Sequence, residues 1–250
     1  MLIAAGFLIA LAIGLTGVGG GVLTAPILIL AFGLPAAASI GTALLFSTSV
    51  KVLSAGLFAI RRQVHGRTLA MLLAGGVPGA LLGPVLLTRL DNRAARPWML
   101  VAVGITVLAT AGFSLLRKRS PSSAKSSEEK GWLPAFSFPI GLEVGFSSAG
   151  AGALGTVLLF NRTKLAPANV VGTDLAFGLI VSACAGGMHL AAGNWIPSAL
   201  RALLVGGIPG AVAGTLLAGR LPADPLRKLT LCWAALLGAM LAIQGFRRIA

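Results

Sequence analysis

The sequence predicts an all-α polytopic membrane protein built from two homologous repeats. Of its 250 residues, 56% are hydrophobic and 10% are charged. Long apolar runs alternate with short polar patches, and the second half of the chain repeats the glycine and proline pattern of the first. This composition lies outside that of soluble globular proteins. The spans are expected to be helical, because strands of a membrane barrel would alternate polar and apolar residues and these runs do not.

Eight apolar stretches follow one another along the chain. They cover residues 2–32, 36–60, 69–87, 97–116, 133–160, 168–192, 198–218 and 226–246. The long hydrophilic segment RKRSPSSAKSSEEK, at 117–130, has the composition of a flexible linker. We therefore predict a first transmembrane repeat at 1–116, a hydrophilic linker at 117–132 and a second repeat at 133–250.

The first stretch is too long for a single crossing, and GLTGVGGG at 14–21 interrupts it. A straight helix over this stretch would be about 45 Å long, against a hydrocarbon core of about 30 Å. Each glycine costs roughly 1 kcal/mol in a helix interior. The pattern predicts two half-helices that meet at a non-helical tip. Backbone exposed at membrane depth is tolerated where protein buries it or where it lines a cavity, so the tip is predicted to be one wall of a binding site.

The second half repeats the first at an offset of 131 residues. This offset pairs Gly14 with Gly145, and it pairs GGVPGA at 75–80 with GGIPGA at 206–211. An internal duplication of this kind is common in secondary transporters. Equivalent loops differ in charge, as expected if the repeats are inverted across the membrane. Inversion requires an odd number of crossings per half, so the first and fifth stretches are predicted to be re-entrant hairpins.

The net charge of +14 comes from basic residues that lie mainly in the loops. They are not interleaved with aromatic residues on a soluble face, so we expect them to face the cytoplasm and anionic lipid, and no nucleic acid partner is expected.

The two tips are predicted to bind an anion. The second half-helix of each pair presents unpaired N–H groups and the positive end of its dipole, which together favour negative charge. The alternative is that the glycines only permit close helix packing. The predicted substrate-binding residues of the tips are Thr16, Gly17, Gly19, Gly20 and Gly21 in the first half, and Ser147, Ser148, Gly150 and Gly152 in the second.

The next helix of each half is expected to begin with a Gly-Thr pair, which adds Thr42 and Thr173 to the predicted site. Ser47 and Lys51 follow on one helix face. Lys51 is the strongest candidate for a fixed positive charge opposite an anion; alternatively, its side chain extends toward the helix end and into water.

Three further ionisable residues lie inside apolar stretches: Glu143, Asp174 and His189. Ionisable groups at membrane depth usually face a cavity or a partner. These three are predicted either to carry a coupling proton or to balance charge within the protein, and both alternatives stay open. His189 alone is more typical of a satisfied residue at a helix end.

An intramembrane enzyme is the competing class, and the motifs disfavour it. HExxH is absent, and GFSSAG at 145–150 lacks the spacing of a rhomboid-type GxSG serine. No enzymatic activity, cofactor or metal is expected.

A set of motifs carries a resemblance to a known family. The first copy reads GLTGVGGGVLTAPILIL, Leu34-Pro35, Gly41-Thr42 and GGVPGALLG, and the second reads GAGALGTVLLF, VVGTDL and GGIPGAVAG. In combination they resemble the TauE/SafE sulfite exporter family over essentially the whole chain. The second copy has Ser148 and Ala151 where the first has Gly17 and Gly20, which leaves open whether both tips bind substrate equally.

The resemblance implies a multi-pass transporter of the bacterial cytoplasmic (inner) membrane that moves, usually exports, small sulfur-containing anions such as sulfite, sulfoacetate or sulfolactate. An interior-negative potential of 100 mV favours outward movement of a monovalent anion by about 2.3 kcal/mol, so a uniporter would suffice. The expected partners are the small anionic substrate and the lipid bilayer, with a homodimer as a further expectation. The alternatives are a permease or channel-like protein for another small solute, and a membrane scaffold without flux.

Overall fold

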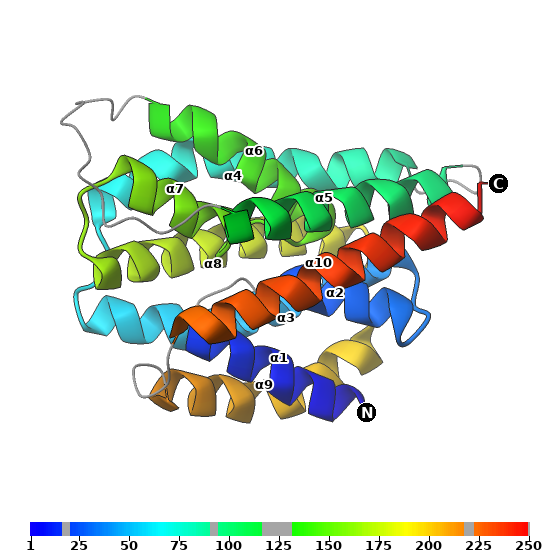
Figure 1. Ribbon diagram of the computed structural model, residues 1–250, viewed down its shortest axis with the longest axis horizontal. Helices are drawn as coiled ribbons and strands as arrows, with labels where there is room; N and C mark the ends of the chain where they lie inside the picture. The colour runs from blue at the N-terminus through cyan, green and yellow to red at the C-terminus, as the bar shows by residue number, and fades with distance from the viewer. Residues whose placement is uncertain (17–20, 91–94, 117–131, 218–222, 250) are drawn as a thin grey trace.

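The computed structural model describes residues 1–16, 21–90, 95–116, 132–217 and 223–249. Within these ranges the chain forms ten α-helices and no strand (Figure 1). The helices are α1 (Leu2–Thr16), α2 (Gly21–Leu30), α3 (Ala36–Ile60), α4 (Gly66–Leu90), α5 (Arg96–Leu116), α6 (Leu133–Ser147), α7 (Leu154–Arg162), α8 (Pro167–Ala191), α9 (Pro197–Leu217) and α10 (Ala223–Arg247). The predicted all-helical fold is confirmed.

The first and fifth apolar stretches are each broken into two short helices, α1 with α2 and α6 with α7. Between α6 and α7 the backbone turns with φ of 62° at Ser148 and 90° at Gly150 and Gly152. Glycine adopts such angles without a steric penalty, which accounts for its concentration at this break. Eight predicted stretches therefore become ten helices in the described part of the chain.

The short helices α6 and α7 form a hairpin that enters and leaves on one side of the bundle. Gly75 of α4 packs against Pro134 near the start of α6, and Gly83, two turns later, packs against Gly145 near its end. α4 and α6 therefore run parallel and start on the same face of the bundle. α7 returns to that face, where residues 163–166 lead into α8 (Figure 1).

Six of the described helices, α3, α4, α5, α8, α9 and α10, are long and apolar enough to cross a membrane by length and composition. Each half of the chain contributes three of them. The short helices α1, α2, α6 and α7 have 9 to 15 residues and are too short to cross the full hydrocarbon core.

The two halves interlock through equivalent contacts. α1 packs against α9, α6 against α4, α5 against α10 and α3 against α8, and each pair joins helices from different halves. A side chain at Gly41 would clash with the carbonyl oxygen of Asn194, and one at Gly172 would clash with that of Gln63. The 131-residue offset relates the two contacts, because it takes Gly41 to Gly172 and Gln63 to Asn194. The start of α3 thus lies against the end of α8, and the start of α8 lies against the end of α3. The two equivalent helices therefore run antiparallel.

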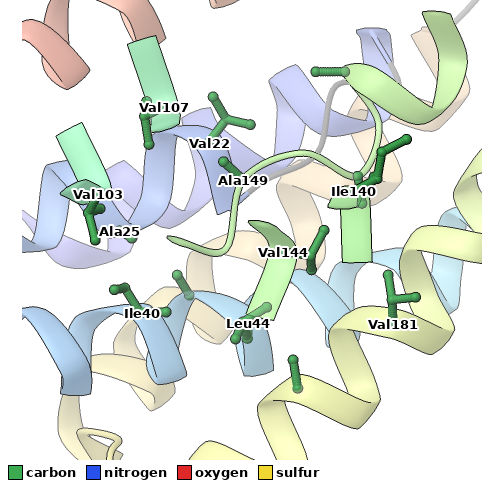
Figure 2. Close-up of a cluster of buried hydrophobic side chains, with 14 of the residues drawn as sticks. Val22, Ala25, Ile40, Leu44, Val103, Val107, Ile140, Val144, Ala149 and Val181 are labelled. Atoms are coloured by element: carbon green, nitrogen blue, oxygen red, sulfur yellow. The ribbon is translucent and has the colours of Figure 1, made fainter. Parts of the chain in front are cut away.

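The apolar core lies between the halves. Val22 and Ala25 of α2, Ile40 of α3 and Val103 of α5 come from the first half, and Val144 of α6 comes from the second (Figure 2). All five side chains are fully buried. The core therefore holds the hairpin of the second half against α2 and α3 of the first.

The prediction that the third helix of the first half and its counterpart begin with Gly-Thr is wrong. α3 begins at Ala36 and α8 at Pro167, so Gly41 and Gly172 lie inside the helices. Proline fixes a φ that suits the first turn of a helix, and the residues Pro35 and Pro167 set these starts. The glycines instead allow the close contacts between α3 and α8 described above.

Candidate functional site

The tip of the second half touches the start of α2 in the first half. The Ser148 hydroxyl donates a hydrogen bond to the carbonyl oxygen of Gly21 at 3.0 Å. A side chain on Gly21 would clash with the Ser148 carbonyl, so glycine at this position lets the two backbones approach. The two broken segments therefore meet inside the bundle.

The second tip is held together by its own polar groups. Ser147 Oγ donates to the carbonyl oxygen of Glu143 at 3.1 Å and accepts from the amide of Ala149 at 3.3 Å. Ser147 and Ser148 are both buried. In this conformation both serine hydroxyls bind backbone atoms, and their contact with a substrate stays a prediction.

Lys51 is buried near the second tip. Its side chain is 2% exposed, and Nζ donates to Gly178 O and to Ser182 Oγ of α8, each at 3.2 Å. A Cβ added to Gly178 would lie 2.8 Å from Lys51 Nζ and 3.2 Å from the side chain of Ala151 in the tip. The ammonium group therefore points across the interface between the halves and does not extend to the helix end.

Asp174 lies one turn before Gly178 on α8, and its carboxylate interacts electrostatically with Lys51. The Thr156 hydroxyl of α7 donates to Asp174 Oδ2 at 2.5 Å. A side chain on Gly155 would clash with the other carboxylate oxygen. Asp174 thus fixes α7 against α8 directly behind the tip.

Glu143 lies on α6, one turn before the tip, and its carboxylate accepts a hydrogen bond from the Thr110 hydroxyl of α5. His189 lies in the last turn of α8 and is fully buried, with Nε2 3.3 Å from the carbonyl oxygen of Gly145. Glu143 therefore joins α6 to α5 and His189 joins α8 to α6, whereas Asp174 joins α8 to α7.

Thr42 and Thr173 make equivalent hydrogen bonds at the starts of other helices. Thr42 Oγ1 accepts from the amide of Ile196, just before α9, and Thr173 Oγ1 accepts from the amide of His65, just before α4, each at 2.9 Å. These bonds satisfy backbone N–H groups at helix starts. They favour a structural role for the two threonines, and their part in substrate binding stays a prediction.

The other predicted site residues divide into two groups. Ser47 is buried on α3, one turn before Lys51, while Gly150 and Gly152 form the second tip. Gly17, Gly19 and Gly20, together with the side chain of Thr16, lie outside the described residues.

Two residues of this region were missed in the sequence, Thr156 and Thr110. Each is a lone hydroxyl residue in an apolar helix, and spacing alone does not indicate the partner on another helix. Thr156 could have been found from the offset, because the first half has Ala25 and Ala43 where the second has Thr156 and Asp174. The paired replacement of two alanines by hydroxyl and carboxylate indicates a contact.

Broken helices that pair across the interface of two repeats are a plan of secondary transporters, in which the irregular backbone at membrane depth lines the binding site. The fold therefore defines a multi-pass membrane protein of the transporter class. A family model described as "Sulfite exporter TauE/SafE" matches residues 2–241. The chain belongs to this family, and membership in a family of membrane transporters confirms the prediction that the protein is not an enzyme.

Two relatives from Bacillus subtilis (strain 168) are named as membrane transporters. The chain is 26% identical over 234 residues to "Probable membrane transporter protein YjnA", a match that covers 89% of this chain and 91% of the relative. It is 33% identical over 174 residues to "Probable membrane transporter protein YtnM", which covers 65% of this chain and 55% of the relative. No solved structure matches the chain.

Proposed function

We propose that the protein is a secondary transporter that exports small sulfur-containing anions, sulfite or organosulfonates such as sulfoacetate and sulfolactate, across the bacterial cytoplasmic membrane. The observation that carries the anion assignment is Lys51, whose buried ammonium group lies at the interface of the halves next to the second tip. The sulfur chemistry rests on the family description.

The substrate site lies between the tips. Lys51 has three N–H groups, of which two bind α8. The start of α7 adds the positive end of its dipole, and the tip glycines leave the backbone free of side chains. A compact oxyanion matches this combination, because its oxygens accept from the ammonium and from backbone N–H groups together.

Asp174 and His189 are assigned to charge balance and packing. Asp174 offsets the charge of Lys51 and receives the Thr156 hydrogen bond. His189 binds the backbone of α6. Glu143 lies apart from this cluster, on the side of α6 that faces α5.

The two repeats, at 1–116 and 133–250, are inverted relative to each other. Three long helices per half and the antiparallel packing of α3 against α8 support this arrangement. In it, the hairpins of α1 with α2 and of α6 with α7 enter the membrane from opposite sides. The second tip then lies near the midplane, where the substrate sites of transporters with inverted repeats are found.

Loop charge supports one orientation. Within the described residues, one face carries the connections 61–65 and 163–166, and the opposite face carries 31–35 and 192–196. The basic residues at the first face are Arg61, Arg62, Arg67, Arg162, Lys164, Arg227 and Lys228. Those at the opposite face are Arg89, Arg96, Arg201, Arg247 and Arg248. The excess of Lys and Arg marks the cytoplasmic side, so both termini face outward.

Counterflow of a labelled sulfonate or sulfite into proteoliposomes tests the proposal, with sulfate and carboxylates as competitors. We expect saturable uptake that sulfonates block. A channel-like protein for another solute, the second candidate, predicts flux without saturation or anion competition. Absence of flux with every sulfur anion in folded protein would contradict the proposal and favour another solute or a scaffold. Light scattering of the purified protein tests the expected homodimer.

A further inference from the structure

A pocket of about 650 Å³ opens between α4, α5, α6 and α7, beside the second tip. Its lining is apolar except for Thr106, Thr110 and Glu143, and Glu143 is the only ionisable residue among the residues that line it. Leu86 and Phe113 at the pocket are 45% and 46% exposed, so the pocket opens on the outer surface of the helix bundle. A single carboxyl group is thus reached from the lipid-facing side.

The same carboxyl group touches the tip. Thr110 donates to Oε1. A Cβ built on Gly150 would lie 3.1 Å from Oε2, so the tip backbone passes directly over the carboxylate. Ser147, which starts the tip, is hydrogen bonded to the carbonyl oxygen of Glu143 itself. Glu143 therefore forms the wall between the pocket and the predicted anion site.

This carboxyl group has no counterpart in the first half, where the equivalent position is Ala12. Asp174, the other acidic residue near the tip, does not line the pocket and is enclosed by Thr156 and Gly155. Among the described residues, Glu143 is thus the one acidic group that faces both the pocket and the tip.

Few charged groups surround Glu143. Within the described residues, the pocket-lining parts of α4, α5 and α7 contribute none, and α2 contains none. α8 contributes His189 at the Gly145 carbonyl, and Lys51 and Asp174 lie on the far side of the tip. Arg227 of α10 binds the carbonyl oxygen of Ser114, one turn beyond Thr110 on α5.

We propose that Glu143 binds one proton together with the transported anion. The inference rests on the proposed function. A carboxylate beside the tip repels an anion bound there and a protonated carboxyl group does not, so proton binding and anion binding favour each other. One proton and one monovalent anion carry no net charge, so the membrane potential does not drive their joint movement. Export then follows the outward concentration gradient of the anion, and a pH gradient that is acidic outside opposes it.

The test uses proteoliposomes with labelled ethanesulfonate. This monovalent anion does not bind protons near neutral pH, so a pH effect belongs to the protein. In the wild type, a pH gradient of one unit should support up to about tenfold accumulation, and a potassium diffusion potential should support little. In Glu143→Gln, the pH gradient should no longer support accumulation of ethanesulfonate, and the potassium diffusion potential should support it instead. An unaltered pH-gradient response in Glu143→Gln would overturn the proposal.

Matched threonines on α5 provide the control. Thr110→Val removes the donor to Glu143 and should shift the pH dependence of counterflow, whereas Thr106→Val leaves that bond in place and should not. Absence of wild-type counterflow with every sulfur anion, sulfite and ethanesulfonate included, would overturn the proposed function and the coupling with it. Wild-type counterflow that responds only to the membrane potential would overturn the coupling alone.

A labelling experiment gives a readout independent of flux. Dicyclohexylcarbodiimide, an apolar reagent that reacts with protonated carboxyl groups, should modify Glu143 in the membrane, as located by peptide mass spectrometry. A water-soluble carbodiimide should not modify it. Modification of Asp174 in place of Glu143 would contradict the assignment.

Discussion

Lys51 of α3 donates a hydrogen bond to Ser182 of α8, and the two residues occupy equivalent positions of the two halves, 131 residues apart. A contact between equivalent positions lies on the axis that relates the halves. Lys51, the only buried lysine among the described residues, is therefore located where the two halves meet. A change in the relative position of the halves would alter the contacts of this ammonium group directly.

We expect Lys51→Gln to lower sulfonate counterflow at least tenfold, because it removes the buried positive charge beside the tip. A tenfold loss corresponds to about 1.4 kcal/mol, a modest value for a charge-assisted hydrogen bond. The measurement is the concentration dependence of counterflow in proteoliposomes. Lys164→Gln, which removes a charge from a loop, is the matched control and should transport normally. Equal transport by the two variants would exclude Lys51 from the anion site.

We expect Gly178→Ala to impair transport, because the added methyl group would lie 2.8 Å from Lys51 Nζ and would displace it. Gly187→Ala, on the same helix, meets no atom within 4 Å and serves as the control. Both variants gain helix propensity of roughly 1 kcal/mol, so thermal unfolding in detergent separates a folding defect from a transport defect. Normal transport by Gly178→Ala would show that the position of the ammonium group is unimportant.

We expect Thr42→Val to lower the free energy of unfolding by about 1 kcal/mol, because the Ile196 amide loses its acceptor. Thr173→Val should cost a similar amount at the His65 amide. Thr48→Val is the control, since Thr48 binds only the Leu44 carbonyl of its own helix. Denaturant titration of the purified protein measures the three values. A cost at Thr48 as large as at Thr42 would contradict the structural role of the paired threonines.

We expect the turn at residues 192–196 to face the outside of the cell and the turn at 163–166 to face the cytoplasm. In a background without Cys184 and Cys232, Asn194→Cys should react with a membrane-impermeant maleimide in intact cells. Lys164→Cys should react only after the membrane is opened. The reverse pattern would invert the proposed orientation, and labelling of both positions in intact cells would contradict the assignment of the turns to opposite faces.

The glycine pattern determined much of this fold in advance. A run of glycines cannot continue a helix across the membrane at low cost, so the breaks after Thr16 and Ser147 followed from the chain alone. The gapless repeat of GGVPGA likewise predicted two equivalent halves. The start of α3 was predicted incorrectly for a related reason, because the glycine at 41 serves a contact with another helix and the sequence does not name that helix.

The sequence by itself determined that this protein lies in a membrane, that its chain is duplicated and that two glycine-rich tips interrupt its helices, because hydropathy, repeats and helix breaking are properties of neighbouring residues. Only the tertiary structure decided that Lys51 reaches Gly178 and Ser182, that Thr156 binds Asp174 and that Glu143 borders a pocket. These contacts join residues on different helices, and which helices pack together depends on the shape and burial of whole surfaces.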